Sequence, residues 1–296
     1  MKQSTSRAVV MLLCLLAIIA GAWYLSRHQL LVAEQKIYIT ATERLADIEF
    51  DPAQALSLQA IKKDLKHWRS GGNIDGHILK SIPAYVHEAK TPQGWKNAFL
   101  HTLIPNVLQL AEFIKTDRTR LLTLLQKQAQ GKKLSKVQKA WLERLFKNYR
   151  IEDQNHQRLL KRLDQIPLSM VLAQAANESA WGRSRFAKQG NALFGQWTWG
   201  NDGIIPKGRP FGATYRVKSF ESISHSIHAY IMNINSHPAY RGFREQRAMM
   251  RQADQSLNVR PLVRSLSQYS ERGEAYPEEL LSIIRVNRLE DFEQSR

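Results

Sequence analysis

Apolar residues recur at helical spacing along much of this chain of 296 residues. The first apolar face covers residues 58–68, and the Asp-Pro pair at 51–52 suits the N-cap and first position of a helix. Two further faces follow at residues 103–125 and 132–149, whereas residues 73–96 contain several Gly and Pro residues. The pattern therefore predicts a helical region in which residues 73–96 are irregular.

A helix is also predicted to begin near Pro167 and to continue through small and apolar residues. Trp181 closes it, and Gly182 stands where glycine commonly terminates a helix. Ser184 is a suitable N-cap for a short helix over residues 185–188.

The first residues predict export from the cytoplasm. Residues 8–25 contain no charged side chain and follow Lys2 and Arg7. As a helix they would span about 27 Å, just short of the hydrocarbon thickness of a bilayer. With small residues at 20–22, the same stretch also suits a cleavable signal. Residues 1–28 are thus either a signal anchor, with the protein on the inner membrane facing the periplasm, or a signal peptide of a periplasmic or cell-envelope protein.

Positive charge is concentrated in one block. Lys and Arg total 43 against 26 Asp and Glu, a formal net charge of +17. Residues 115–162 contain 14 Lys and Arg against 4 Asp and Glu, a net of +10, whereas residues 165–296 have a net charge of +5. Cationic surfaces favour polyanions. For an exported protein these are wall carboxylates or an anionic bilayer, and nucleic acid is not expected. The alternative for this block is a solvated helix face.

Several chemistries receive no support from the sequence. The single cysteine, Cys14, permits neither an internal disulfide nor a cysteine-based zinc cluster. His225, His228 and His237 lack the HxxxH or HExxH spacing of a metal site, so neither metal nor cofactor is predicted. Ser224 lacks the context of a nucleophile elbow, which argues against a serine hydrolase.

Glu178 is the candidate for acid chemistry. It lies in the last turn of the helix predicted from Pro167. Aromatic neighbours such as Trp181 and Phe194, together with the negative end of the helix dipole, are expected to raise the pKa of its carboxyl. Glycosidic cleavage needs such a protonated carboxyl, because the leaving oxygen must receive a proton. One glutamate alone is weak evidence, since most glutamates at helix ends are solvated.

The residues around Glu178 extend this signal over a long segment. The motifs are AQAANESAWG at 173–182, NALFG at 191–195, ATYRVKSFES at 213–222, NSHPAY at 235–240 and YPEELLSII at 276–284. In this order they resemble the glucosaminidase domain of glycoside hydrolase family 73, a group of bacterial peptidoglycan hydrolases with a mannosyl-glycoprotein endo-β-N-acetylglucosaminidase-like domain. The resemblance covers about residues 165–290, and GQWTWG and residues 269–276 are most similar to its Bax-type subgroup.

The resemblance implies a mainly α (α+β) lysozyme-like fold with a small β-hairpin beside the cleft. It implies metal-independent hydrolysis of the β-1,4 bond after N-acetylglucosamine in peptidoglycan, with Glu178 as the catalytic acid. Tyr240 matches a cleft tyrosine of this group, where a phenol orients water or the acetamido group, although packing against the helix of Glu178 explains it equally well.

A second acid is less well supported. Many members of the family are thought to carry one on the hairpin, and residues 197–214 contain only Asp202. Its Gly-Asn-Asp-Gly setting is typical of a turn. If Asp202 does not serve, the 2-acetamido group of the substrate is the alternative nucleophile.

Aromatic residues near the hairpin are candidates for sugar binding. Alternation puts Trp197 and Trp199 on one face of a strand, while Asn191 better suits hydrogen bonds to the backbone. The candidate substrate-binding residues are Trp181, Asn191, Phe194, Trp197, Trp199 and Tyr215. For each aromatic residue, core packing is the alternative.

The predicted organisation is a membrane or signal segment (1–28), a basic helical region (29–164) and a catalytic domain (165–296). The preferred function is a peptidoglycan glucosaminidase that binds glycan strands, and its oligomeric state stays open. The alternatives are a catalytically weak or inactive wall-binding module and hydrolysis of another N-acetylglucosamine polymer. The basic helical region is hypothesised to cover or restrain the active site.

Overall fold

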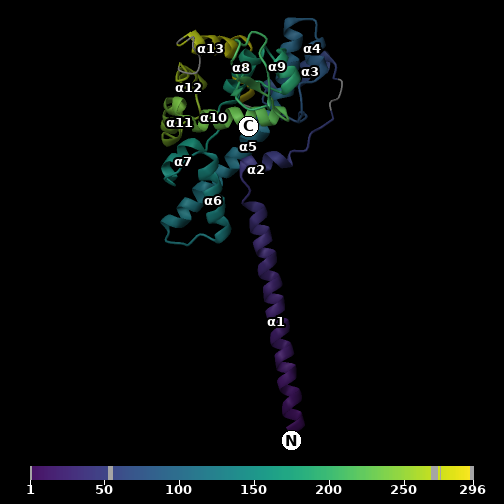
Figure 1. Ribbon diagram of the computed structural model, residues 1–296, viewed down its shortest axis with the longest axis vertical. Coiled ribbons are helices and arrows are strands. Elements are labelled where there is room, and N and C mark those ends of the chain that lie inside the picture. Colours follow the sequence, from purple (N-terminus) through teal and green to yellow (C-terminus); the bar gives the residue numbers. More distant parts are fainter. Residues whose placement is uncertain (1, 53–55, 268–272, 274, 294–296) are drawn as a thin grey trace.

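The computed structural model describes residues 2–52, 56–267, 273 and 275–293, with side chains from residue 20 onward. Helix α1 (Lys2–Ile37) projects as one long rod from the body formed by the other elements (Figure 1). The expected membrane segment, residues 8–25, lies in α1, and its side chains up to residue 19 are outside the described part. In the part that is described, no helix has the length and apolar character needed to cross a membrane.

Two buried helices form the centre of the body. The first is the long helix α5 (Pro92–Ala129), and the second is α8 (Leu168–Ser179), which packs against it. Helices α3 (Leu58–Arg69), α4 (Ala84–Glu88) and α10 (Ile223–Ser236) also pack on α5. The apolar face predicted at residues 103–125 therefore belongs to α5, the helix on which the others of the core pack.

The C-terminal elements close over α8. Helix α13 (Ala275–Val286) and the 3₁₀ turn η3 (Leu289–Glu293) contact it directly. Glu293 accepts hydrogen bonds from the backbone nitrogen and the hydroxyl of Ser169, each at 2.9 Å. Because Pro167 offers no side-chain cap, this carboxylate provides the negative charge that stabilises the N-terminus of α8.

Shorter elements complete the body. On the N-terminal side these are α2 (Ala41–Arg44), η1 (Leu45–Asp47), α6 (Lys136–Asn148) and α7 (His156–Arg162). On the C-terminal side they are α9 (Arg185–Gly190), η2 (Pro238–Tyr240), α11 (Arg241–Gln252) and α12 (Val259–Arg264). The Ser184 hydroxyl accepts from the backbone nitrogen of Ala187 at 3.1 Å, which confirms it as the N-cap of α9.

The small sheet differs from a simple hairpin. Strands β1 (Trp197–Thr198) and β2 (Gly203–Ile204) both pair antiparallel with β3 (Arg216–Lys218), in the order β1-β3-β2. An added Cβ at Gly203 would lie 2.6 Å from the carbonyl oxygen of Val217. Glycine at this position therefore permits the close approach of β2 to β3. A mainly helical protein with a small antiparallel sheet is confirmed, and it is consistent with a lysozyme-like fold.

The predicted N-cap at Asp51 is wrong. Helix α3 begins at Leu58, and the Ser57 hydroxyl caps it by accepting from the backbone nitrogen of Ala60. The Asp51 carboxylate instead accepts from the backbone nitrogen of Ile78 at 2.7 Å. The Asp51 carboxylate therefore binds the backbone of the irregular segment and does not cap a helix.

The hydrophobic core is continuous along the chain. Its buried apolar side chains extend from Ala41 in α2 to Phe292 in η3. The core crosses the division expected at residue 165, and that division stays a prediction.

Candidate active site

Glu178 lies at the C-terminal end of α8, where the backbone turns sharply. The helix ends at Ser179, and Ala180, Trp181 and Gly182 follow with φ values of 50°, 58° and 74°. Left-handed geometry in the two non-glycine residues costs about 1–3 kcal/mol each. An added Cβ at Gly182 would meet the Phe99 ring at 2.8 Å. The glycine predicted to follow the helix is therefore needed for close packing, and the left-handed conformation begins at Ala180.

A directed hydrogen-bond chain ends at the Glu178 carboxyl. The Tyr230 hydroxyl donates to Gln174 Oε1, and Gln174 Nε2 donates to the Tyr276 hydroxyl at 3.0 Å. The Tyr276 hydroxyl donates to Glu178 Oε1 at 3.0 Å. Gln174 is fully buried, and Glu178 is half-buried. The chain fixes one carboxyl oxygen of Glu178 as an acceptor.

Glu178 lines a cleft of about 830 Å³ between the sheet and α10. The lining comes from α8, α10, η2, the sheet with the segment before it, and the N-terminal half of the chain. Its residues are Thr42, Asn148, Arg150, Glu178, Phe194, Gly195, Gln196, Trp197, Trp199, Lys218, His228, Ala229, Met232, Asn233, Ser236, His237 and Tyr240. Among these described residues, Glu178 contributes the only carboxylate. Thr42, Asn148 and Arg150 lie within the predicted basic helical region, which therefore forms part of the cleft wall.

Tyr240 lies in the same cleft and is almost fully buried. Burial, opposed by a hydrogen bond with Asn233 and reinforced by the nearby Glu178, raises the pKa of Tyr240 to about 12. The phenol is therefore protonated near neutral pH and available as a hydrogen-bond donor.

His228 forms a second uncharged polar group of the cleft. Burial, with a smaller contribution from His225, lowers its pKa to about 4. Its Nε2 lies 3.2 Å from the Thr42 hydroxyl of α2. Near neutral pH this imidazole is neutral and connects the N-terminal segment to α10.

Two tryptophans form an exposed aromatic edge of the cleft. Trp197 is 53% exposed and Trp199 is 73% exposed, and both line the cleft. The Tyr215 ring meets Trp197 edge-on at 4.6 Å and supports it from behind without lining the cleft itself. Phe194 lines the cleft but is buried and stacks on Tyr230 at 4.1 Å.

Two other predicted substrate contacts lie away from the cleft lining. The Trp181 ring packs edge-on against Trp95 and Phe99 of α5, with centroids 6.1 and 5.8 Å away. The Asn191 side chain donates to the carbonyl oxygens of Phe220 and Glu221 at 3.1 and 3.4 Å. Asn191 therefore forms hydrogen bonds to the backbone, as its sequence context suggested.

Asp202 occupies the turn between β1 and β2, outside the cleft lining. Its carboxylate accepts from the Thr198 hydroxyl at 2.9 Å, and Lys218 Nζ lies 4.0 Å away. The Thr198 hydrogen bond is the main cause that lowers the pKa of Asp202. The contacts are those of an ionised turn residue.

The residues that sequence reasoning missed are the supports of Glu178. Gln174 precedes it by one helical turn, and a polar residue on the same face of an apolar helix is a usable signal. Tyr230 and Tyr276 join it from α10 and α13. Tyr276 begins the YPEELLSII motif, but the sequence does not indicate its contact with Gln174 or Glu178. Residues 269–272 and 274 of the motif that ends at Tyr276 lie outside the described residues. In the described part of the chain no group of three or more His, Cys, Asp or Glu side chains is placed to hold a metal ion.

Comparison with known proteins covers the part of the chain that contains this cleft. The model of the family described as mannosyl-glycoprotein endo-beta-N-acetylglucosaminidase matches residues 154–289. Protein bax of Escherichia coli (strain K12) is 36% identical over 209 residues, which are 67% of this chain and 72% of that protein. No solved structure matches the chain. The family match contains Glu178, Tyr240 and the whole sheet.

Proposed function

Because the chain belongs to the Bax-type glucosaminidase-domain family, we propose that it is a peptidoglycan hydrolase that cleaves the β-1,4 bond after N-acetylglucosamine. Glu178 is the general acid of this reaction. The observation that supports the proposal is the position of its half-buried carboxyl in a large cleft, held on one oxygen by the Tyr276 hydroxyl at 3.0 Å.

The proposed mechanism uses the two oxygens of Glu178 differently. Oε1 accepts from Tyr276, so the protonated carboxyl carries its proton on Oε2 and delivers it to the leaving glycosidic oxygen. Trp197 and Trp199 provide exposed aromatic faces on which sugar rings dock. The protonated Tyr240 phenol donates to the attacking water or to the 2-acetamido group. Since Asp202 is bonded to Thr198, the acetamido group is the favoured nucleophile.

The test is digestion of purified sacculi by the Glu178→Gln variant. Gln keeps the shape and the acceptor oxygen but has no acidic proton, so the release of reducing ends is expected to fall at least about 100-fold. The unfolding midpoint is expected to change little. Mass spectrometry of the parent digest is expected to find N-acetylglucosamine at the new reducing ends, whereas N-acetylmuramic acid there would indicate a muramidase.

Glu221→Gln is the matched control. Its carboxylate is 69% exposed and pairs only at 3.8 and 4.0 Å with Lys80 and His225, so the same chemical change is expected to leave activity intact. Full activity of Glu178→Gln would refute the assignment of the general acid.

A non-catalytic wall-binding module is the second candidate function. It is favoured by the single carboxylate in the described cleft lining. This alternative predicts that the parent and Glu178→Gln chains sediment equally with sacculi and that neither releases product at any pH between 4 and 8.

We also propose that the protein acts outside the cytoplasm. The support is the uncharged stretch at residues 8–25 behind Lys2 and Arg7. Fractionation of cells that express a tagged chain tests this, because an anchored form stays in the membrane pellet after alkaline washing and a cleaved form is released. Recovery in the cytoplasm would refute it.

A further inference from the structure

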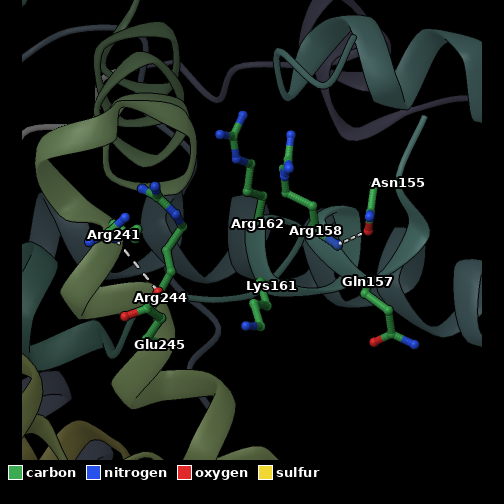
Figure 2. Close-up of a pocket in the computed structure, with 8 residues that line it drawn as sticks. All are labelled: Asn155, Gln157, Arg158, Lys161, Arg162, Arg241, Arg244 and Glu245. Atoms are coloured by element: carbon green, nitrogen blue, oxygen red, sulfur yellow. Dashed lines mark hydrogen bonds and ion pairs between the residues drawn. The ribbon is translucent and has the colours of Figure 1, made fainter. Parts of the chain in front are cut away.

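A cationic pocket of about 330 Å³ lies between α7 and α11. Figure 2 shows Arg158, Lys161 and Arg162 from α7 and Arg241 and Arg244 from α11 around it. Glu245 is the one carboxylate among the described residues that line it. The lining therefore has five formal positive charges against one negative charge.

The charge of Arg244 is the most unusual part of this pocket. The residue is only 5% exposed, and Nη1 donates to the carbonyl oxygens of Ile234 and His237 at 2.8 and 2.9 Å. Within the described residues, no carboxylate forms an ion pair with it. Burial and the nearby Arg162 and Arg247 lower its pKa to about 10, and the Glu245 carboxylate opposes this only in part. A buried cation that forms no ion pair is costly.

Arg247, three residues along the same helix, provides the contrast. It is equally buried, but its Nε lies 3.9 Å from the Asp164 carboxylate, and its other nitrogens bind backbone carbonyls. Arg244 therefore lacks the ion pair that Arg247 forms, although Glu245 of the same helix lies in the pocket lining.

The pocket adjoins the cleft through the backbone. Arg162 Nη1 donates to the carbonyl oxygens of Tyr149 and Arg150 at 2.6 and 2.9 Å, and Arg244 bonds the carbonyl of His237. Arg150 and His237 both line the cleft. Arginines of the cationic pocket thus bind the backbone of two residues that line the cleft, which places the pocket beside the proposed glycan site.

We propose that this pocket is a carboxylate-binding subsite for the peptide stems of the wall glycan. The inference rests on the proposed function, since it concerns the same substrate, and it adds that the protein distinguishes peptide-bearing strands from bare strands. Guanidinium groups suit carboxylates because they offer paired, charge-assisted hydrogen bonds.

The test uses the full chain with Lys161→Gln and Arg241→Gln together. Both side chains are exposed; Arg241 makes only a 3.7 Å ion pair with Glu245, so the fold is expected to be unaffected. Affinity is measured by fluorescence anisotropy for labelled peptide-bearing strands and for strands stripped of peptide by an amidase, in the Glu178→Gln background so that strands stay intact. We expect affinity for peptide-bearing strands to fall about tenfold and affinity for bare strands to stay unchanged.

Lys132→Gln with Lys133→Gln is the charge-matched control, because these exposed residues lie in the loop after α5. An equal loss on both strands, no loss on either, or the same loss in the control would overturn the proposal. Binding of vesicles containing phosphatidylglycerol through Lys161 and Arg241, without binding of peptide-bearing strands, would also overturn the proposal. Cleavage is measured separately in the chain with Glu178 intact, so failure of the hydrolase assignment and failure of the subsite are distinguishable.

Discussion

Two buried polar networks lie in the same helical core and are built in opposite ways. Around Asp164, the guanidinium groups of Arg118, Arg247 and Arg251 lie 3.6, 3.9 and 3.0 Å from one carboxylate. Around Glu178, the hydrogen-bonding partners traced from Tyr276 inward are uncharged. In the first network the carboxylate is paired with cations, whereas in the second the carboxyl lines a cleft.

The difference separates a carboxylate with a structural role from the carboxyl to which we assign the proposed chemistry. Arg118 and Arg247 also donate to backbone carbonyls at the end of α7, so the Asp164 network joins α7 to α5 and α11. One carboxylate there faces three guanidinium groups, and these contacts hold the three helices together. The Tyr276 hydroxyl holds one oxygen of Glu178 in position without adding charge to the cleft.

The largest expected effect on stability comes from breaking the charged network. Asp164→Asn removes the counter-charge of the fully buried Arg247, and we expect the free energy of unfolding to fall by about 3–5 kcal/mol. Urea unfolding followed by circular dichroism measures this. Asp153→Asn is the control, because its pair with Arg158 at 3.1 Å is half-exposed and is worth less than about 1 kcal/mol. Equal losses of unfolding free energy in the two variants would contradict the distinction between the buried network and an exposed ion pair.

The stability that the Asp164 network contributes should depend on pH. The surrounding arginines outweigh the effect of burial and hold the pKa of Asp164 below the ordinary value of 3.8. The unfolded chain therefore binds more protons in that range, so the stabilisation is complete above pH 3.8 and is lost as pH falls through the folded pKa. We expect the stability gap between the parent chain and Asp164→Asn to be constant from pH 7 to 5 and to narrow below 3.8. A gap that narrows already near pH 6 would contradict this.

A smaller effect is expected from Tyr276→Phe in the neutral network. The ring stays and the hydrogen bond to Glu178 is lost, so kcat on sacculi is expected to fall about tenfold, equivalent to about 1.4 kcal/mol. The alkaline limb of the pH–rate profile, which reports the general acid, should shift as well, and packing alone would not cause this shift. Tyr85→Phe removes a phenol that is 3.4 Å from the Thr102 hydroxyl, outside the cleft lining, and should leave both kcat and the profile unchanged.

The smallest effect is expected from Asp202→Asn. Its carboxylate accepts from Thr198 in an exposed turn, and Asn retains an acceptor there. We expect less than about a twofold change in the release of reducing ends. A loss of more than tenfold would identify Asp202 as the missing second acid and would exclude the acetamido mechanism.

Local chemistry made part of the site predictable. The cap at Ser184 and the position of Glu178 in the last turn of a helix depend on residues a few positions apart, and both are as expected. The pairing of β1 and β2 through β3 depends on a strand 13 residues or more away, and the partner Tyr276 is 98 residues from Glu178. Such contacts are decided by packing of the whole core. The Trp181 ring faces α5 for the same reason, since the left-handed turn after Ser179 reorients it.

The hydrogen-bond chain to Glu178 also has a stereochemical consequence. A flipped Gln174 amide would present its oxygen to Tyr276, whose hydroxyl would then donate to that oxygen and no longer to Glu178. The polarity of one buried amide therefore makes two chemically equivalent carboxyl oxygens inequivalent. In the proposed mechanism the scissile bond approaches from the Oε2 side, so the orientation of Gln174 sets the direction of protonation relative to the sugar ring.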